Sequence, residues 1–124
     1  MLDATFILYV SDLDRSTRFY AQLLQRSPVP FEPTFVMFFL ESGARLGLVA
    51  RETVEDSPAM TSQGFELDFP VGDNADVDRL HDEWAGLGAV IVRPPHDMPF
   101  AYNFLAADPD GHRLRVFCRR VAGS

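Results

Sequence analysis

The sequence is poor in cysteine and in positive charge. Cys118 is its only cysteine, so an intrachain disulfide is excluded, and we interpret this thiol as a buried strand residue. There are 11 Lys and Arg residues against 18 Asp and Glu, which gives a net charge of -7. Phosphate binding requires clustered cations, so this balance argues against nucleic acid as a partner.

Long apolar runs are also missing. No stretch approaches the ~18–20 apolar residues that a membrane span requires, and the stretch MLDATFILYVSDLD lacks the basic region of a signal peptide. We therefore expect no membrane partner and a cytoplasmic location. The sequence also contains no glycine-rich phosphate loop, no CxxC pair and no Ser/His/Asp signature.

Phenylalanine, by contrast, is abundant. The chain has 11 phenylalanines among 124 residues and is 47% hydrophobic, which suits one globular domain over residues 1–124. Large aromatic side chains that do not fill a core line ligand sites or subunit interfaces. The composition therefore favours a small-molecule site or a homodimer interface beside the ordinary core.

The first half of the sequence predicts a strand, a helix and a hairpin. Residues 4–10 alternate as a strand, and Ser11 can cap a helix that ends before the prolines that follow Ser27. Residues 35–40 and 45–50 predict two strands joined by a turn.

The second half repeats this order. A polar linker, residues 52–63, separates module one (1–51) from module two (64–120). Module two is expected to contain a strand over 64–71, a helix opened by Gly72-Asp73-Asn74 with Trp84 as a core anchor, a strand over 89–92, a proline-rich loop over 94–99 and a strand over 101–106.

A hairpin ends module two. Asp108-Pro109-Asp110-Gly111 is a turn in which proline fixes φ and glycine supplies positive φ. In the exit strand Leu114 and Val116 alternate with Arg115, so Arg115 belongs on the face away from the core. We therefore predict an α+β fold of two paired βαβββ modules whose other faces form an open cleft.

Three stretches carry a resemblance to a known family: YVSDLDRSTRFYAQLL, GFELDFPVGD and DPDGHRLRVF. With them, almost the whole chain resembles the vicinal oxygen chelate superfamily, which contains glyoxalases, bleomycin-resistance proteins and extradiol dioxygenases. The resemblance implies paired βαβββ modules with substrates bound in the cleft, commonly completed in a homodimer.

The resemblance implies that the family's metalloenzymes carry their ligands at four strand positions, which fall here on Thr5, on or near Gly47, near Glu66 and on Arg115. A guanidinium has fixed positive charge and no acceptor, so Arg115 would repel a metal ion. We expect no metal and no cofactor, and we hypothesise that Arg115 and Glu66 form a charge-assisted pair in the ion's place. The alternative is that both are ordinary solvated strand residues.

The leading hypothesis is a metal-independent small-molecule-binding protein that resembles drug-sequestering, antibiotic-resistance members of the family. Its partner would be an aromatic or cationic organic compound, and no catalytic residue is assigned. The predicted ligand-binding residues are Tyr9, Phe38 (or its neighbour Phe39), Glu66, Tyr102, Arg115 and Phe117.

Other functions remain open at this point. One alternative is a metal-dependent lyase, isomerase or dioxygenase that uses displaced ligands such as Glu66, His96 and His112. Others are a metal-free enzyme with Glu66 as general base and an interaction module whose cleft is filled by its own side chains. His81 and His112 are expected to be exposed, and His96 is expected in a loop beside Asp97.

Overall fold

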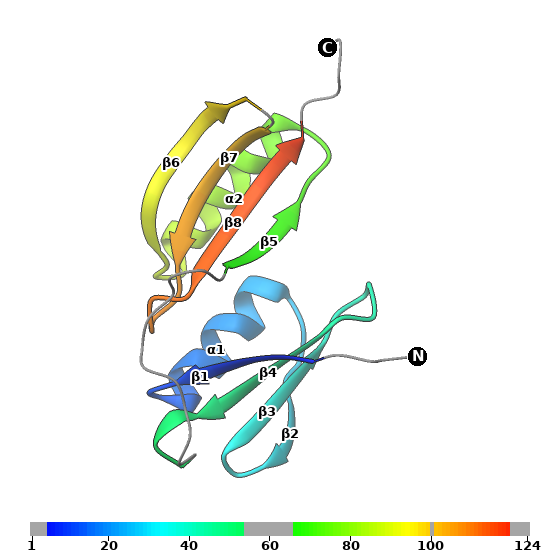
Figure 1. Ribbon diagram of the computed structural model, residues 1–124, viewed down its shortest axis with the longest axis vertical. Coiled ribbons are helices and arrows are strands. Elements are labelled where there is room, and N and C mark those ends of the chain that lie inside the picture. The colour runs from blue at the N-terminus through cyan, green and yellow to red at the C-terminus, as the bar shows by residue number, and fades with distance from the viewer. Residues whose placement is uncertain (1–4, 54–65, 100, 120–124) are drawn as a thin grey trace. The chain divides into compact units, whose positions relative to one another are not determined.

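A computed structural model describes residues 5–53, 66–99 and 101–119 (Figure 1). The chain divides into two compact units, residues 1–61 and 62–124. We call their described parts module one (5–53) and module two (66–99 and 101–119). Within this part of the chain, neither helix is long and apolar enough to cross a membrane.

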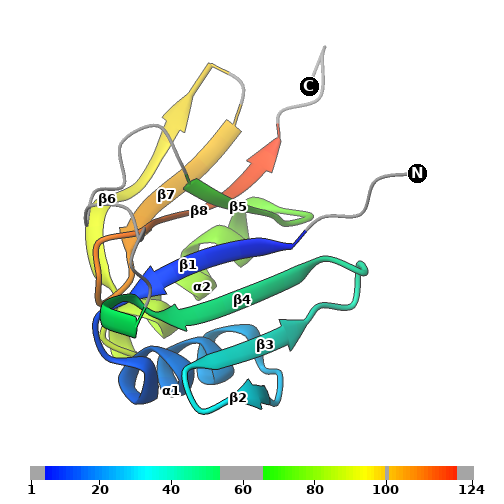
Figure 2. The same ribbon diagram turned by 60° about the horizontal axis from the view of Figure 1, so that its bottom comes forward.

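Module one is a four-stranded mixed sheet with one helix on it (Figure 2). Its strands occur in the order β1-β4-β3-β2, with β1 parallel to β4 and the other pairs antiparallel. The elements are β1 (Phe6–Val10), α1 (Leu13–Leu24), β2 (Val29–Glu32), β3 (Phe35–Phe39), β4 (Arg45–Ala50) and a 3-10 turn (Arg51–Thr53).

Module two repeats this architecture with the order β5-β8-β7-β6. Here β5 is parallel to β8, and the other pairs are antiparallel. The elements are β5 (Glu66–Pro70), α2 (Asn74–Gly86), β6 (Val90–Met98), β7 (Ala101–Ala107) and β8 (Arg113–Arg119). The predicted α+β class and the repeated βαβββ order are confirmed.

Each helix begins at an aspartate after a strand. Asp12 accepts a hydrogen bond from the Arg15 amide at 3.0 Å, and Asp73 accepts one from the Asp76 amide at 3.1 Å. These bonds satisfy amides that lack a partner within the helix. The prediction that Ser11 caps the first helix was wrong by one residue, since Asp12 holds that place.

Each helix covers one face of its own sheet and leaves the other face open. In module one Tyr20 of α1 is fully buried, as are Leu48 and Phe38 of the strands. In module two the Trp84 ring of α2 lies edge-on to Phe104, with centroids 5.4 Å apart, so its predicted role as a core anchor is confirmed. We call the sheet faces that point away from the helices the open faces.

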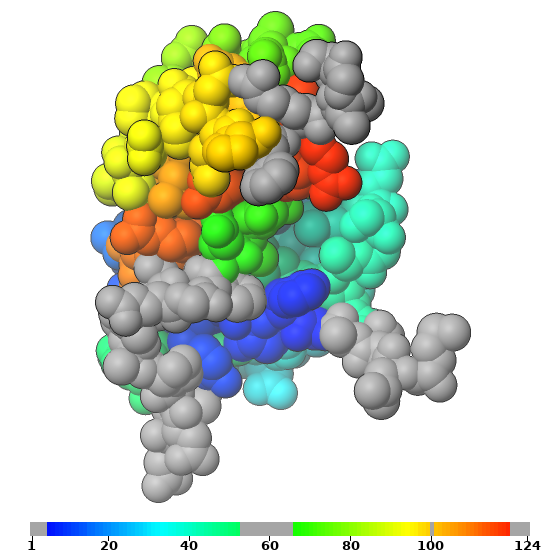
Figure 3. Space-filling model, turned by 45° about the horizontal axis from the view of Figure 1, so that its top comes forward, coloured from blue at the N-terminus to red at the C-terminus, as the bar shows by residue number. Residues whose placement is uncertain are grey.

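The strand β6 differs from the prediction. Residues 94–99 were expected to form a loop, but β6 runs from Val90 to Met98 through Pro94 and Pro95. It lies at a sheet edge, and its pairing with β7 is irregular between Arg93 and His96. Pro94 and Pro95 lie in this irregular stretch, so their lack of an amide hydrogen does not interrupt regular hydrogen bonding between the strands. In the space-filling view β6 (yellow) forms part of the outer surface of module two (Figure 3).

Candidate functional site

The open face of module two brings Arg115 of β8 and Glu66 of β5 together. Arg115 Nε donates to Glu66 Oε2 at 2.9 Å, and both side chains are partly exposed. The predicted pair is therefore confirmed, across 49 positions of sequence. It forms because β5 and β8 are parallel neighbours, with Asp68 opposite Arg115 and Glu66 at the start of β5.

A buried asparagine fixes the other end of the guanidinium. Asn103 of β7 is fully buried, and its Oδ1 accepts a hydrogen bond from Arg115 Nη1. Its Nδ2 donates to the carbonyl of His96 at 3.4 Å. Met98 Sδ lies 3.9 Å from the same Nη1. Strands on both sides of β8 therefore orient Arg115, and no described residue accepts a hydrogen bond from its Nη2, which can donate to a ligand.

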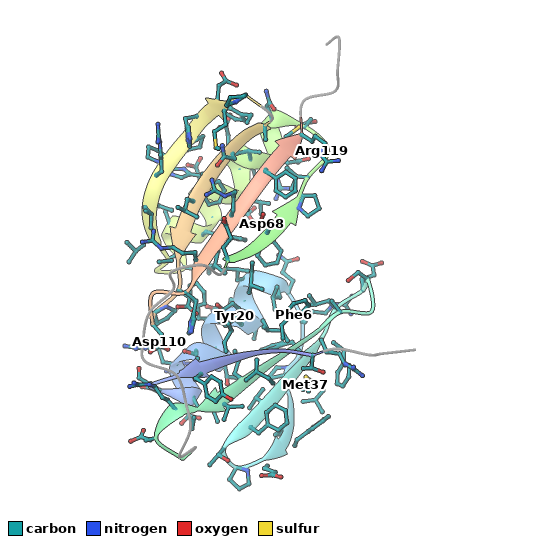
Figure 4. The ribbon with its side chains drawn as sticks, viewed as in Figure 1. Phe6, Tyr20, Met37, Asp68, Asp110 and Arg119 are labelled. Carbon is teal, nitrogen blue, oxygen red and sulfur yellow. The ribbon has the colours of Figure 1, made fainter. Side chains whose placement is uncertain are left out.

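Asp68 adds a second carboxyl to this cluster (Figure 4). Partial burial, a hydrogen bond with Glu66 and the charge of Glu66 raise the pKa of Asp68 from 3.8 to about 6, while Arg115 opposes the shift. The cluster therefore gains one negative charge as the pH rises through about 6.

Asp68 and Asn103 were not among the predicted site residues. Asp68 lies two positions after Glu66 and therefore on the same face of the strand. The alternation in GFELDFPV thus indicates that Asp68 belongs to the same site. Asn103 was a polar residue inside an apolar strand, which needs a hydrogen-bond partner when buried. Both residues could therefore have been suspected as site residues from the sequence alone.

The other predicted ligand-binding residues divide between the two faces. Phe117 pairs with Asn103 and lies on the open face of module two, half-buried. Tyr9 pairs with Val49 on the open face of module one and is also half-buried. Their positions agree with the prediction, while ligand binding by them stays a proposal.

Phe38 and Tyr102 are not on the open faces. Phe38 is fully buried on the side of β3 that α1 covers, and its neighbour Phe39 is the one on the open face, 45% exposed. Tyr102 points to the helix side, where its hydroxyl donates to Asp78 of α2 at 2.6 Å. The expected place of Phe38 and Tyr102 on the inner faces was therefore wrong, because each has the strand parity of core residues such as Phe104, while the alternative Phe39 does lie on the open face.

Module one carries an aromatic cluster on its open face. The Phe31 ring lies edge-on to Phe35, with centroids 5.5 Å apart, and tilted against Phe39 at 6.3 Å. Phe31 and Phe39 are both about half exposed. These exposed rings offer flat apolar surface to an aromatic ligand.

The histidines are less exposed than expected. His112 Nδ1 lies 2.7 Å from Asp108 Oδ2, with the aspartate side chain fully buried, so this pair closes the turn before β8. The His81 ring packs edge-on against Phe104 at 5.5 Å. His96 and Asp97 occupy adjacent positions of β6, whose side chains point to opposite faces, so they cannot act as a dyad.

The donor set of module two does not suit a metal ion. Of the two family ligand positions on this sheet, one is the cation Arg115, and the carboxylate of the other, Glu66, already accepts from it. In module one the corresponding Gly47 has no side chain. Among the described residues, no three His, Cys, Asp or Glu side chains are grouped to hold a metal.

The fold and the site together define a protein built from βαβββ modules with a polar cluster on an open sheet face. Sequence comparison then gives the family: a model of the Glyoxalase/Bleomycin resistance protein/Dioxygenase superfamily matches residues 3–116. The chain belongs to this superfamily, as the three motifs predicted.

Individual relatives agree. The phenazine antibiotic resistance protein EhpR of Enterobacter agglomerans is 33% identical over 115 residues, which cover 89% of this chain and 86% of EhpR. The solution NMR structure of protein ATC0852 from Agrobacterium tumefaciens is 43% identical, with a TM-score of 0.87 over 98% of this chain and 100% of that one.

A more distant structure shows the same fold. The glyoxalase-related enzyme from Fulvimarina pelagi is 24% identical and superposes with a TM-score of 0.82, covering 94% of this chain and 87% of that chain. At this identity the likeness concerns the fold alone.

Proposed function

We propose that this protein binds a planar aromatic compound without a metal ion and so protects against it, as a sequestering resistance protein does. The observation that carries the proposal is the Arg115–Glu66 pair, which holds a fixed cation where the family's metalloenzymes carry a metal ligand. A guanidinium repels a divalent ion but can donate to a polar ligand group.

Two further observations support an aromatic ligand. Aromatic rings occur on the open faces, with the partly exposed Phe31 cluster in module one and the half-buried Phe117 in module two. A relative that shares a third of the sequence over most of both chains is a phenazine antibiotic resistance protein. We infer that phenazines are the first compounds to test.

The test is a titration of the purified protein with phenazine-1-carboxylate, followed by intrinsic fluorescence and calorimetry, with and without EDTA. We expect saturable binding that EDTA does not weaken and a ligand that mass spectrometry recovers unchanged. The variant Arg115→Met should bind at least about tenfold more weakly, because it loses a charge-assisted hydrogen bond to the carboxylate.

Tyr102→Phe is the matched control, because its hydroxyl points to α2 and away from the open face. It should leave the affinity unchanged. Circular dichroism of both variants tests that the fold is retained. Absence of saturable binding, or loss of binding on metal removal, would overturn the proposal.

A second candidate function, acid–base catalysis without a metal, is favoured by Asp68. A carboxyl whose pKa is raised to about 6 can both take up and release protons near neutral pH. The same mixtures, incubated between pH 5 and 8, decide between the functions. Ligand that is consumed by the wild type but not by Asp68→Asn supports catalysis, and ligand that stays intact supports sequestration.

A further inference from the structure

His96 lies on the same open face as Arg115, in the strand β6. It pairs directly with Asn103, whose side chain contacts Arg115. The next pair along, Asp97 with Tyr102, belongs to the helix side, because the Tyr102 hydroxyl reaches Asp78 of α2. Alternation then places His96 opposite to them, on the open face.

The local backbone sets the tautomer of this histidine. His96 Nδ1 lies 3.0 Å from the carbonyl oxygen of Pro94. A carbonyl can only accept, so Nδ1 carries the proton and donates it, and in the neutral ring Nε2 retains its lone pair. No described residue forms a hydrogen bond with Nε2, and the side chain is partly exposed.

The open face therefore carries two complementary polar atoms: Arg115 Nη2, a donor, and His96 Nε2, an acceptor. We propose that His96 is a specificity residue that accepts a hydrogen bond from an amino or hydroxyl group on the ring of the aromatic ligand. This inference rests on the proposed function and deepens it, because it selects substituted heteroaromatics that carry a donor over those that do not.

Paired probes test the proposal. Dissociation constants are measured for 2-aminophenazine and 2-(dimethylamino)phenazine, which differ in the presence of N–H donors. The wild type should bind the amino compound about fivefold to tenfold more tightly, as one hydrogen bond provides. In His96→Leu the two dissociation constants should agree within about twofold. His96→Gln, whose amide oxygen can accept a hydrogen bond, should restore part of the preference for the amino compound.

The control variant Tyr102→Phe should keep the wild-type ratio. A second measurement needs no ligand: long-range proton–nitrogen NMR spectra of the histidine rings should show Nδ1 of His96 protonated and Nε2 bare at pH 8. Dominance of the other tautomer overturns the proposal.

The outcomes distinguish the role of His96 from the proposed function. Phenazine-1-carboxylate that fails to saturate the wild type overturns the proposed function and the role of His96 with it. If phenazine-1-carboxylate binds, a ratio of the two aminophenazine dissociation constants near unity, or a ratio that His96→Leu leaves unchanged, overturns the role of His96 alone.

Discussion

Replacement of Asp68 by asparagine should make the stability of the protein less dependent on pH. The pKa of the folded carboxyl is raised to about 6, so the folded state binds this proton more tightly than the unfolded state. Its contribution to stability is fully present below the unfolded pKa of 3.8 and is lost as the pH rises through about 6. Asparagine resembles the protonated acid and cannot lose a proton.

The magnitude follows from the shift. The difference between 3.8 and about 6 corresponds to ~3 kcal/mol if solvent did not intervene. Asp68 is only partly buried, with more than a third of its surface exposed, and solvent screening reduces the effect to ~1 kcal/mol. We therefore expect Asp68→Asn to match the wild type at pH 4 and to exceed its free energy of unfolding by ~1 kcal/mol at pH 7.5.

Urea unfolding at intervals between pH 4 and 7.5 measures this difference. Glu41→Gln, at an exposed turn residue, is the control and should run parallel to the wild type. Carbon-detected NMR titration of the Asp68 carboxyl reads its pKa directly. Parallel stability profiles for Asp68→Asn and wild type, together with an Asp68 midpoint near 4, would refute the reasoning.

Two further predictions concern packing and the β7–β8 turn. Burial lowers the pKa of His112, but the hydrogen bond with Asp108 and the nearby negative charges outweigh it and raise the pKa, so His112 contributes stability below pH 6.5 that is lost as the pH rises through the folded pKa. His112→Gln should therefore cost about 1.5–3 kcal/mol at pH 6 and less at pH 9, by urea unfolding; an equal cost at both would contradict this. Gly47→Ala places a methyl 2.7 Å from Ile7 Cδ1 and should lower stability by about 1–3 kcal/mol, whereas Gly72→Ala, with open space, should change it by less than about 0.5 kcal/mol. Equal melting temperatures for the two glycine variants would show that the Ile7 and Phe35 side chains move aside at no cost.

Much of the fold could be predicted because its signals are local. The aspartates before α1 and α2, the turn at Asp108 and the alternation in β5 and β8 each fix an element without reference to distant residues. The repeat then follows from their order. The Arg115–Glu66 pair was predicted because both residues fall on metal-ligand positions of the family that the sequence resembles, and alternation along β8 placed Arg115 on the face away from the core.

The failures share a physical cause. Strands β2 and β6 contain Pro30, Pro94 and Pro95, and local rules treat proline as a break, whereas an edge strand tolerates it on the side that has no partner. Phe38 lies in an apolar run, FVMFF, which has no polar residue to mark the open side. The hydrogen-bond partners of Asn103 depend on the register of three strands, which cannot be predicted from local sequence patterns.

The prolines of the edge strands have a consequence for the life of the protein in a crowded cell. A bare strand edge is a template on which another chain can add a strand, and such addition starts aggregation. In β6 the exposed valines Val90 and Val92 would suit that process, but Pro94 and Pro95 interrupt the row of amide donors beside them. Pro30 does the same in β2. The prolines that made β2 and β6 hard to predict from the sequence therefore also protect the edges of the two sheets against strand addition by other molecules.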